Sequence, residues 1–86
     1  SPALVMGTGL VGASVAQAMT RAGVEVHLQD ARYSHAVVAA SRGAGTLTSL
    51  DPAAYQLVVV AVPPGALASV IAEALETYPN ATVTDV

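Results

Sequence analysis

Short apolar runs alternate along the chain with longer segments in which apolar residues recur at helical spacing. The first run, Ala3–Met6, stops at Gly7, and the helical pattern of Leu10–Ala22 follows it. Gly23 comes directly after that pattern and is of the residue type that commonly ends helices. This alternation is typical of βαβ units, in which helices join parallel strands.

The second predicted strand, Val24–Gln29, alternates strictly between apolar and polar residues. A strand covered on both faces of a parallel sheet is expected to be apolar throughout. We therefore expect the face that carries Glu25, His27 and Gln29 to be incompletely covered. Further along, Thr46–Thr48 predicts a brief third strand.

Capping residues mark two short helical segments between these strands and the next. Ser34 is of a type that caps helices, and it predicts a short helix that ends before Gly43. Asp51 and Pro52 predict the cap and the first residue of a single helical turn.

Leu57–Val62 is the clearest predicted strand, because it is β-branched and apolar on both faces. Pro63 and Pro64 end it and open a helix. That helix carries one apolar stripe, formed by Leu67, Val70, Ile71, Ala74 and Leu75. Tyr78–Asn80 predicts a turn into a fifth strand, Thr82–Val86.

These elements together predict an α/β fold, a Rossmann-type doubly wound parallel sheet of five strands in the order 3-2-1-4-5. A sheet of this kind has a helix after each strand, whereas this sequence ends on a strand. We therefore expect residues 1–86 to be the N-terminal part of a domain that is truncated at its C-terminal end.

Composition and charge exclude several classes of protein. A hydrophobic content of 53% excludes a disordered tail, and the absence of Phe and Trp predicts a core of small side chains. Three Arg, no Lys and a net charge of −3 exclude a nucleic-acid partner, which needs a basic surface. The absence of Cys excludes disulfides and thiolate zinc sites, and no other metal cluster is visible.

The longest apolar run, Leu57–Pro64, is far shorter than the roughly 20 residues that span a membrane. No basic segment precedes an apolar run, so no signal peptide is predicted. We expect a cytoplasmic protein without a membrane partner.

A glycine motif of the form G-x-G-x-x-G lies between the first predicted strand and helix, at Gly7, Gly9 and Gly12. In such a motif Gly7 permits the tight turn, Gly9 lets a pyrophosphate approach, and Gly12 lets the helix pack closely on the strand. No acid occurs between Ser1 and Val24, so nothing opposes anion binding at the helix N-terminus. The motif predicts a dinucleotide-binding domain.

Asp30 ends the second predicted strand, 18 residues after Gly12. A carboxylate there accepts hydrogen bonds from the ribose 2′- and 3′-hydroxyls and repels a 2′-phosphate, which favours NAD over NADP. The alternative for Asp30 is a helix or turn cap. Arg32 either meets a 2′-phosphate, stacks on adenine, or is a solvated surface charge. NAD is the predicted cofactor.

Further candidates lie where other strands end. Ala61–Pro64 falls on the same sheet edge as the glycine motif, or simply ends a strand. Asp85 is either a site residue or a helix cap. His27 and His35 have no nucleophile or carboxylate at a catalytic spacing, so structural or surface roles are predicted. Packing or loop-anchoring roles are predicted for Tyr33, Tyr55 and Tyr78.

Gly7–Ser14 resembles the glycine motif of prephenate dehydrogenases, with Val11 in place of the commoner Ile. The resemblance continues through Asp30, Val58–Pro64 and Thr82–Val86 and so covers essentially the whole chain. It implies NAD-dependent oxidative decarboxylation of prephenate to 4-hydroxyphenylpyruvate, in tyrosine biosynthesis.

The resemblance also implies which parts of the enzyme this chain holds. The family's catalytic His and its dimer-forming helical domain lie beyond these residues. No catalytic residue is therefore assigned, and the chain alone is expected to be inactive. The parent protein is expected to be a homodimer. The implied cofactor-binding residues are Gly7, Thr8, Gly9, Leu10, Val11, Gly12, Asp30, Ala31, Arg32, Ala61, Val62 and Pro63.

Three other functions are compatible with these residues. An arogenate dehydrogenase shares the whole pattern. The β-hydroxyacid dehydrogenases share the fold but usually have Met where this chain has Val11. A non-catalytic nucleotide-sensing module shares both the glycine turn and Asp30.

Overall fold

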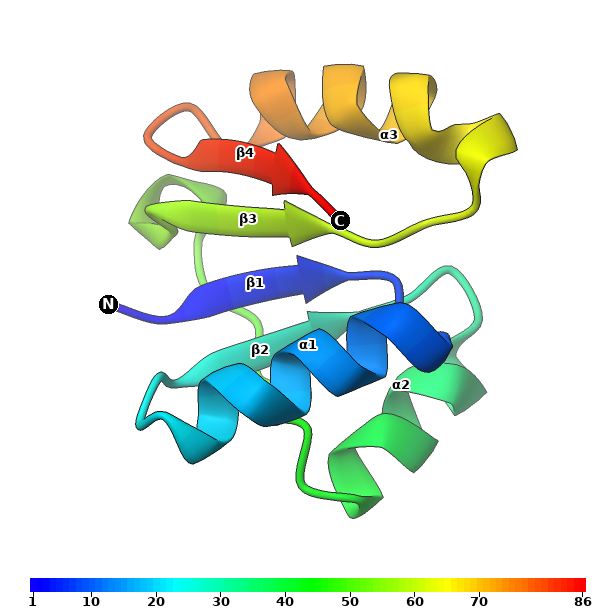
Figure 1. Ribbon diagram of the computed structural model, residues 1–86. Coiled ribbons are helices and arrows are strands. Elements are labelled where there is room, and N and C mark those ends of the chain that lie inside the picture. The colour runs from blue at the N-terminus through cyan, green and yellow to red at the C-terminus, as the bar shows by residue number, and fades with distance from the viewer.

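The computed structural model describes all 86 residues and contains one four-stranded parallel sheet. Its strands are β1 (Ala3–Met6), β2 (Val26–Gln29), β3 (Leu57–Val60) and β4 (Thr82–Asp85). They lie in the order β2-β1-β3-β4, with all four arrows pointing the same way (Figure 1). The predicted α/β class and Rossmann-type topology are confirmed.

Helices cover both faces of the sheet, as a doubly wound fold requires. They are α1 (Leu10–Arg21), α2 (Tyr33–Ser41) and α3 (Pro64–Thr77). Figure 1 shows α1 and α2 on one side of the sheet and α3 on the other. None of the three has the length and apolar character that a membrane-spanning helix needs.

Two apolar clusters, one on each face, form the core. On the α1 and α2 face, Val5 and Val59 of the sheet pack with Ala16 of α1. On the opposite face, Val58 packs with Ala74 of α3. The helix residues in these contacts are small, so the helices lie close to a sheet of β-branched side chains, which is the packing that the composition predicts.

The predicted third strand is wrong, and with it the count of five strands. Only Thr46 pairs with the sheet, through one isolated bridge to His27. The Thr46 hydroxyl lies 3.0 Å from the Thr48 hydroxyl, and no second residue of this segment pairs with β2. The bridge nevertheless lies beyond β2, which is the place that the predicted order gives to this segment.

Three smaller predictions also need correction. The strand predicted over Leu57–Val62 ends at Val60. Ser34 does not cap α2, which begins at Tyr33 and has no side-chain cap. Leu75 is 59% exposed, because Ala74 is the residue of that turn that meets the sheet. The cap predicted at Asp51 is confirmed, since its carboxylate accepts the N–H of Ala53 at 2.9 Å.

The polar face of β2 is also covered more fully than its alternating pattern predicts. His27 is completely buried, whereas Glu25 and Gln29 are exposed. The ring of Tyr55 covers His27 edge-on, with 5.6 Å between ring centres. A second ring, Tyr78, packs edge-on against Tyr55. The packing roles predicted for Tyr55 and Tyr78 and the structural role predicted for His27 fit this arrangement.

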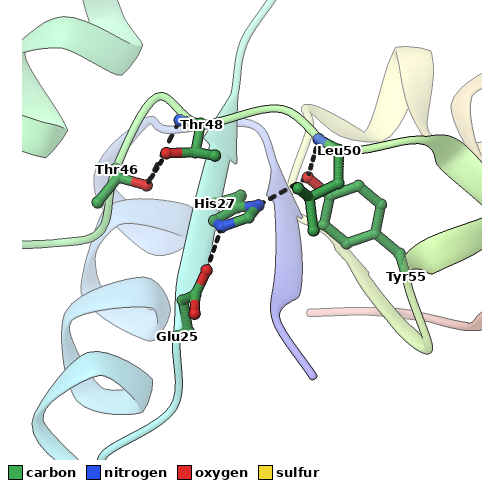
Figure 2. Close-up of polar contacts among 6 residues, drawn as sticks. All are labelled: Glu25, His27, Thr46, Thr48, Leu50 and Tyr55. Carbon is green, nitrogen blue, oxygen red and sulfur yellow. Dashed lines mark hydrogen bonds and ion pairs between the residues drawn. The ribbon is translucent and has the colours of Figure 1, made fainter.

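A chain of hydrogen bonds satisfies the buried His27 ring (Figure 2). The Tyr55 hydroxyl accepts the N–H of Leu50 at 3.1 Å and lies 2.7 Å from His27 Nδ1. Nε2 lies 2.7 Å from the Glu25 carboxylate. Every group has a partner when Tyr55 donates to Nδ1 and the neutral ring donates from Nε2 to Glu25.

Replacing Tyr55 with Phe is expected to lower the free energy of unfolding by about 1–3 kcal/mol, because it leaves Nδ1 of the buried His27 without a partner and removes the acceptor of the Leu50 N–H. Tyr78→Phe is the matched control, since its hydroxyl donates only to the exposed side chain of Gln29. Urea denaturation of both variants tests this expectation. A larger loss in Tyr78→Phe than in Tyr55→Phe would contradict it.

Candidate functional site

The glycine motif lies where three strands end side by side. The N–H of Gly7 donates to Gln29 of β2 at 2.8 Å, and the N–H of Ala61 after β3 donates to Met6 of β1 at 2.8 Å. Gly7 has φ +97°, a backbone conformation that side chains rarely adopt. This glycine therefore turns the chain sharply from β1 toward α1 at the carboxyl edge of the sheet.

Two of the three motif glycines are required by close backbone packing. A Cβ at Gly12 would lie 1.9 Å from the carbonyl oxygen of Gly7, and a Cβ at Gly7 would lie 2.3 Å from that of Ala61. The same Cβ at Gly7 would come within 3.2 Å of Val62 Cγ1. The structure thus brings the glycine turn together with two of the predicted residues that follow β3.

Gly9 differs from its two neighbours in the motif, because a Cβ there would meet no atom within 4 Å. It is the N-cap residue of α1, and no side chain caps that helix. The first turn of α1 contains no acid. Free N–H groups and the positive end of the helix dipole therefore face an open space, which is the arrangement that binds phosphates.

A cavity of about 490 Å³ extends from this turn between α1 and α2. Its polar lining comes from both helices and from the segments next to them, namely Thr8, Ser14, Gln17, His35 and Arg42. His35 is exposed, in keeping with the surface role predicted for it. The i, i+3 and i+7 spacing of His35, Val38 and the C-cap residue Arg42 is the sequence signal that places them on one face of α2.

The Asp30 carboxylate is hydrogen-bonded directly to the glycine turn. Its Oδ2 accepts the N–H of Thr8 at 2.7 Å and the Thr8 hydroxyl at 2.8 Å, and its Oδ1 accepts the N–H of Arg32 at 2.8 Å. Asp30 is therefore a turn cap as well as a candidate ribose acceptor. The side chain of Thr8 was not expected to take part in this, because residue spacing alone does not show that two loops meet.

The charge of Asp30 is favoured by these donors. Partial burial by itself raises the pKa of the carboxyl, but the N–H groups of Thr8 and Arg32, the Thr8 hydroxyl and the nearby His35 outweigh it. The pKa consequently lies below the usual 3.8, and the group is ionised at neutral pH.

The remaining predicted residues lie around this edge with exposed side chains. Leu10 is 87% exposed and Val11 is 57% exposed at the start of α1. Ala31 and Arg32 are exposed between β2 and α2, and Arg32 forms no ion pair. Pro63 is the exposed N-cap residue of α3.

Asp85 and Tyr33 form no hydrogen bond with the residues of the site, although Tyr33 lines a small cavity together with Asp30. Asp85 ends β4 opposite Val60, and its exposed carboxylate makes no hydrogen bond. Tyr33 is 67% exposed at the start of α2, so it anchors no loop by burial. No group of three His, Cys, Asp or Glu side chains is placed to hold a metal ion.

The chain is similar to a curated protein and to a solved structure. A probable prephenate dehydrogenase, NovF, of Streptomyces niveus is 40% identical over 70 residues, which are 81% of this chain and 19% of that protein. The crystal structure of Synechocystis arogenate dehydrogenase superposes with a TM-score of 0.85 at 23% identity, covering 100% of this chain and 32% of that one. No family model matches the sequence.

Proposed function

We propose that the chain is the dinucleotide-binding part of an NAD-dependent enzyme that oxidatively decarboxylates prephenate. The premise of this proposal is that the sequence belongs to the prephenate dehydrogenase family. The chain spans only about a fifth of the length of the curated relative that it matches. Residues 1–86 are then the N-terminal part of a dinucleotide-binding domain. Substrate binding, catalysis and dimerisation belong to other parts of a cytoplasmic enzyme of tyrosine biosynthesis.

The observation that carries this proposal is the uncapped N-terminus of α1 above Gly9, with an ionised Asp30 beside it. The N–H groups of the first helical turn suit a pyrophosphate, and the Asp30 carboxylate suits the adenosine ribose. Ala61 and Val62 border the same turn and would line the dinucleotide. Bound NAD supplies the hydride acceptor, while the residues of this chain hold and orient it.

The carboxylate also supports the choice of NAD over NADP. A 2′-phosphate next to Asp30 would bring two negative groups together, and the three donors that favour the ionised carboxylate make this repulsion persistent. Arg32 is the nearest arginine in the sequence that would offset the repulsion, since its exposed side chain forms no ion pair in this structure.

An absorbance assay of nicotinamide reduction tests the proposal. The intact parent enzyme, rather than residues 1–86 alone, is mixed with prephenate or arogenate in the presence of NAD or NADP. We expect turnover with prephenate and NAD. Turnover with arogenate and not with prephenate would show that arogenate is the substrate. Faster turnover with NADP than with NAD would show that NADP is the cofactor. Binding of NAD without turnover of either substrate would instead favour a nucleotide-sensing module.

Gly9→Ala is expected to weaken NAD binding about tenfold without changing the melting temperature. The new methyl group meets no protein atom within 4 Å, so the fold accommodates it, but it occupies the space through which a pyrophosphate reaches the backbone. Calorimetric titration and thermal melting measure the two quantities.

Gly65→Ala is the matched control for this substitution, because a Cβ there also meets nothing within 4 Å and lies at the start of α3 rather than α1. It should leave NAD binding unchanged and should not lower the melting temperature, because Ala is the better helix former. Equal NAD affinities for Gly9→Ala and Gly65→Ala would place the phosphates elsewhere.

A further inference from the structure

The Asp30 carboxylate has most of its accepting positions occupied by the protein itself. An ionised carboxylate offers about four lone-pair positions, two on each oxygen. The N–H and the hydroxyl of Thr8 fill those of Oδ2, at 2.7 and 2.8 Å. The N–H of Arg32 fills one position on Oδ1, at 2.8 Å. One accepting position therefore remains, and it lies on Oδ1.

Thr8 is buried in a position from which its hydroxyl donates to Oδ2 of Asp30. The residue is only 6% exposed, although it lies in the turn between β1 and α1. Its hydroxyl makes one hydrogen bond, to a carboxylate 22 residues further along the chain. This bond joins the glycine turn to the loop after β2 and, together with the bond from the Thr8 N–H, occupies Oδ2 and leaves a position on Oδ1 available.

We propose that Thr8 is the positioning residue that sets the preference for NAD: it holds Oδ2 of Asp30 so that Oδ1 alone accepts a ribose hydroxyl. This inference rests on the proposed function and narrows it, because Asp30 then accepts one hydroxyl rather than both the 2′- and the 3′-hydroxyl. Since the carboxylate cannot turn away, it stays directed at the place where a 2′-phosphate would lie.

The test compares dissociation constants of NAD and NADP for the purified protein and for variants at Thr8. Thr8→Val keeps the shape and removes the hydroxyl, so NAD affinity should fall about tenfold while NADP affinity changes little. Thr8→Ala removes the same hydroxyl with less bulk and serves if the valine variant melts early. Thr8→Ser keeps the hydroxyl and should bind NAD within about twofold of the original.

A double-mutant cycle separates positioning from a general effect on folding. In the Asp30→Asn background, Thr8→Val should no longer change the ratio of NAD to NADP affinity. Three outcomes would overturn the role of Thr8 while leaving the proposed cofactor intact. They are an equal loss of NAD and NADP affinity in Thr8→Val, the same change in the affinity ratio in the Asp30→Asn background, and an NAD affinity of Thr8→Ser as low as that of Thr8→Val. An original protein that binds neither nucleotide, or that prefers NADP, would overturn the proposed cofactor and this inference together.

Discussion

Gly12→Ala is expected to lower the free energy of unfolding by about 3 kcal/mol and to abolish NAD binding as α1 separates from the sheet. The added Cβ would lie 1.9 Å from the carbonyl oxygen of Gly7, 2.9 Å from its carbonyl carbon and 3.0 Å from Ala61 Cβ. Two of these atoms belong to the backbone of the turn and cannot rotate away. Relief therefore requires α1 to move off β1, which opens the core around Ala16.

Urea denaturation followed by circular dichroism measures this loss. Gly9→Ala is the matched control, because it adds the same methyl group three residues earlier, where no atom lies within 4 Å. The free energy of unfolding should fall for Gly12→Ala and stay constant for Gly9→Ala. Similar stabilities for the two variants would show that the contact between α1 and β1 is looser than described.

Asp30→Asn is expected to weaken NAD binding on the order of 100-fold, since a hydrogen bond to a charged acceptor contributes about 1.5–3 kcal/mol. The substitution also weakens the hydrogen bonds that join the glycine turn to Asp30. The amide has one oxygen to offer, whereas three donors meet the carboxylate, from Thr8 and Arg32. NADP affinity should fall much less, because the substitution also removes the charge that opposes a 2′-phosphate.

Calorimetric titration of both nucleotides tests the Asp30 prediction. Asp51→Asn provides the control, because Asp51 also accepts a backbone N–H but caps the single turn at Pro52–Ala54, outside the site. Both substitutions change the net charge equally, so a general electrostatic effect would appear in both. Equal losses of affinity for NAD and NADP in Asp30→Asn would argue against a role for Asp30 in choosing the cofactor.

The features of the fold that the sequence predicted best are those with strong local patterns. Leu57–Val62 is apolar on both faces and Leu10–Ala22 has helical spacing between two glycines, so each resembles only one kind of element. Both exist in the structure, the strand ending two residues early. The strand predicted over Thr46–Thr48 failed because β-propensity in three residues is too weak a signal to show that only Thr46 pairs with the sheet.

The candidate site was predictable in outline and not in its contacts. The glycine spacing predicted where the turn lies. The position of Asp30 directly after a strand predicted that Asp30 lies at the same edge of the sheet as this turn. The bond between Thr8 and Asp30 depends on the side chain of a residue that the motif leaves free to vary. The burial of His27 was missed for a similar reason, since the ring that covers it comes from Tyr55, far away in the chain.

The position of β1 has a consequence for the order in which the chain folds. The first segment of the sequence is an inner strand of the sheet, paired with β2 on one side and with β3 on the other. Ala3 finds its partner Leu57 only across more than half of the chain, and contacts of such long range form slowly. The glycine turn needs Ala61 beside Gly7, so it takes its final shape only with that late pairing. Pairing of β1 with β3 and completion of the candidate site are therefore expected to coincide.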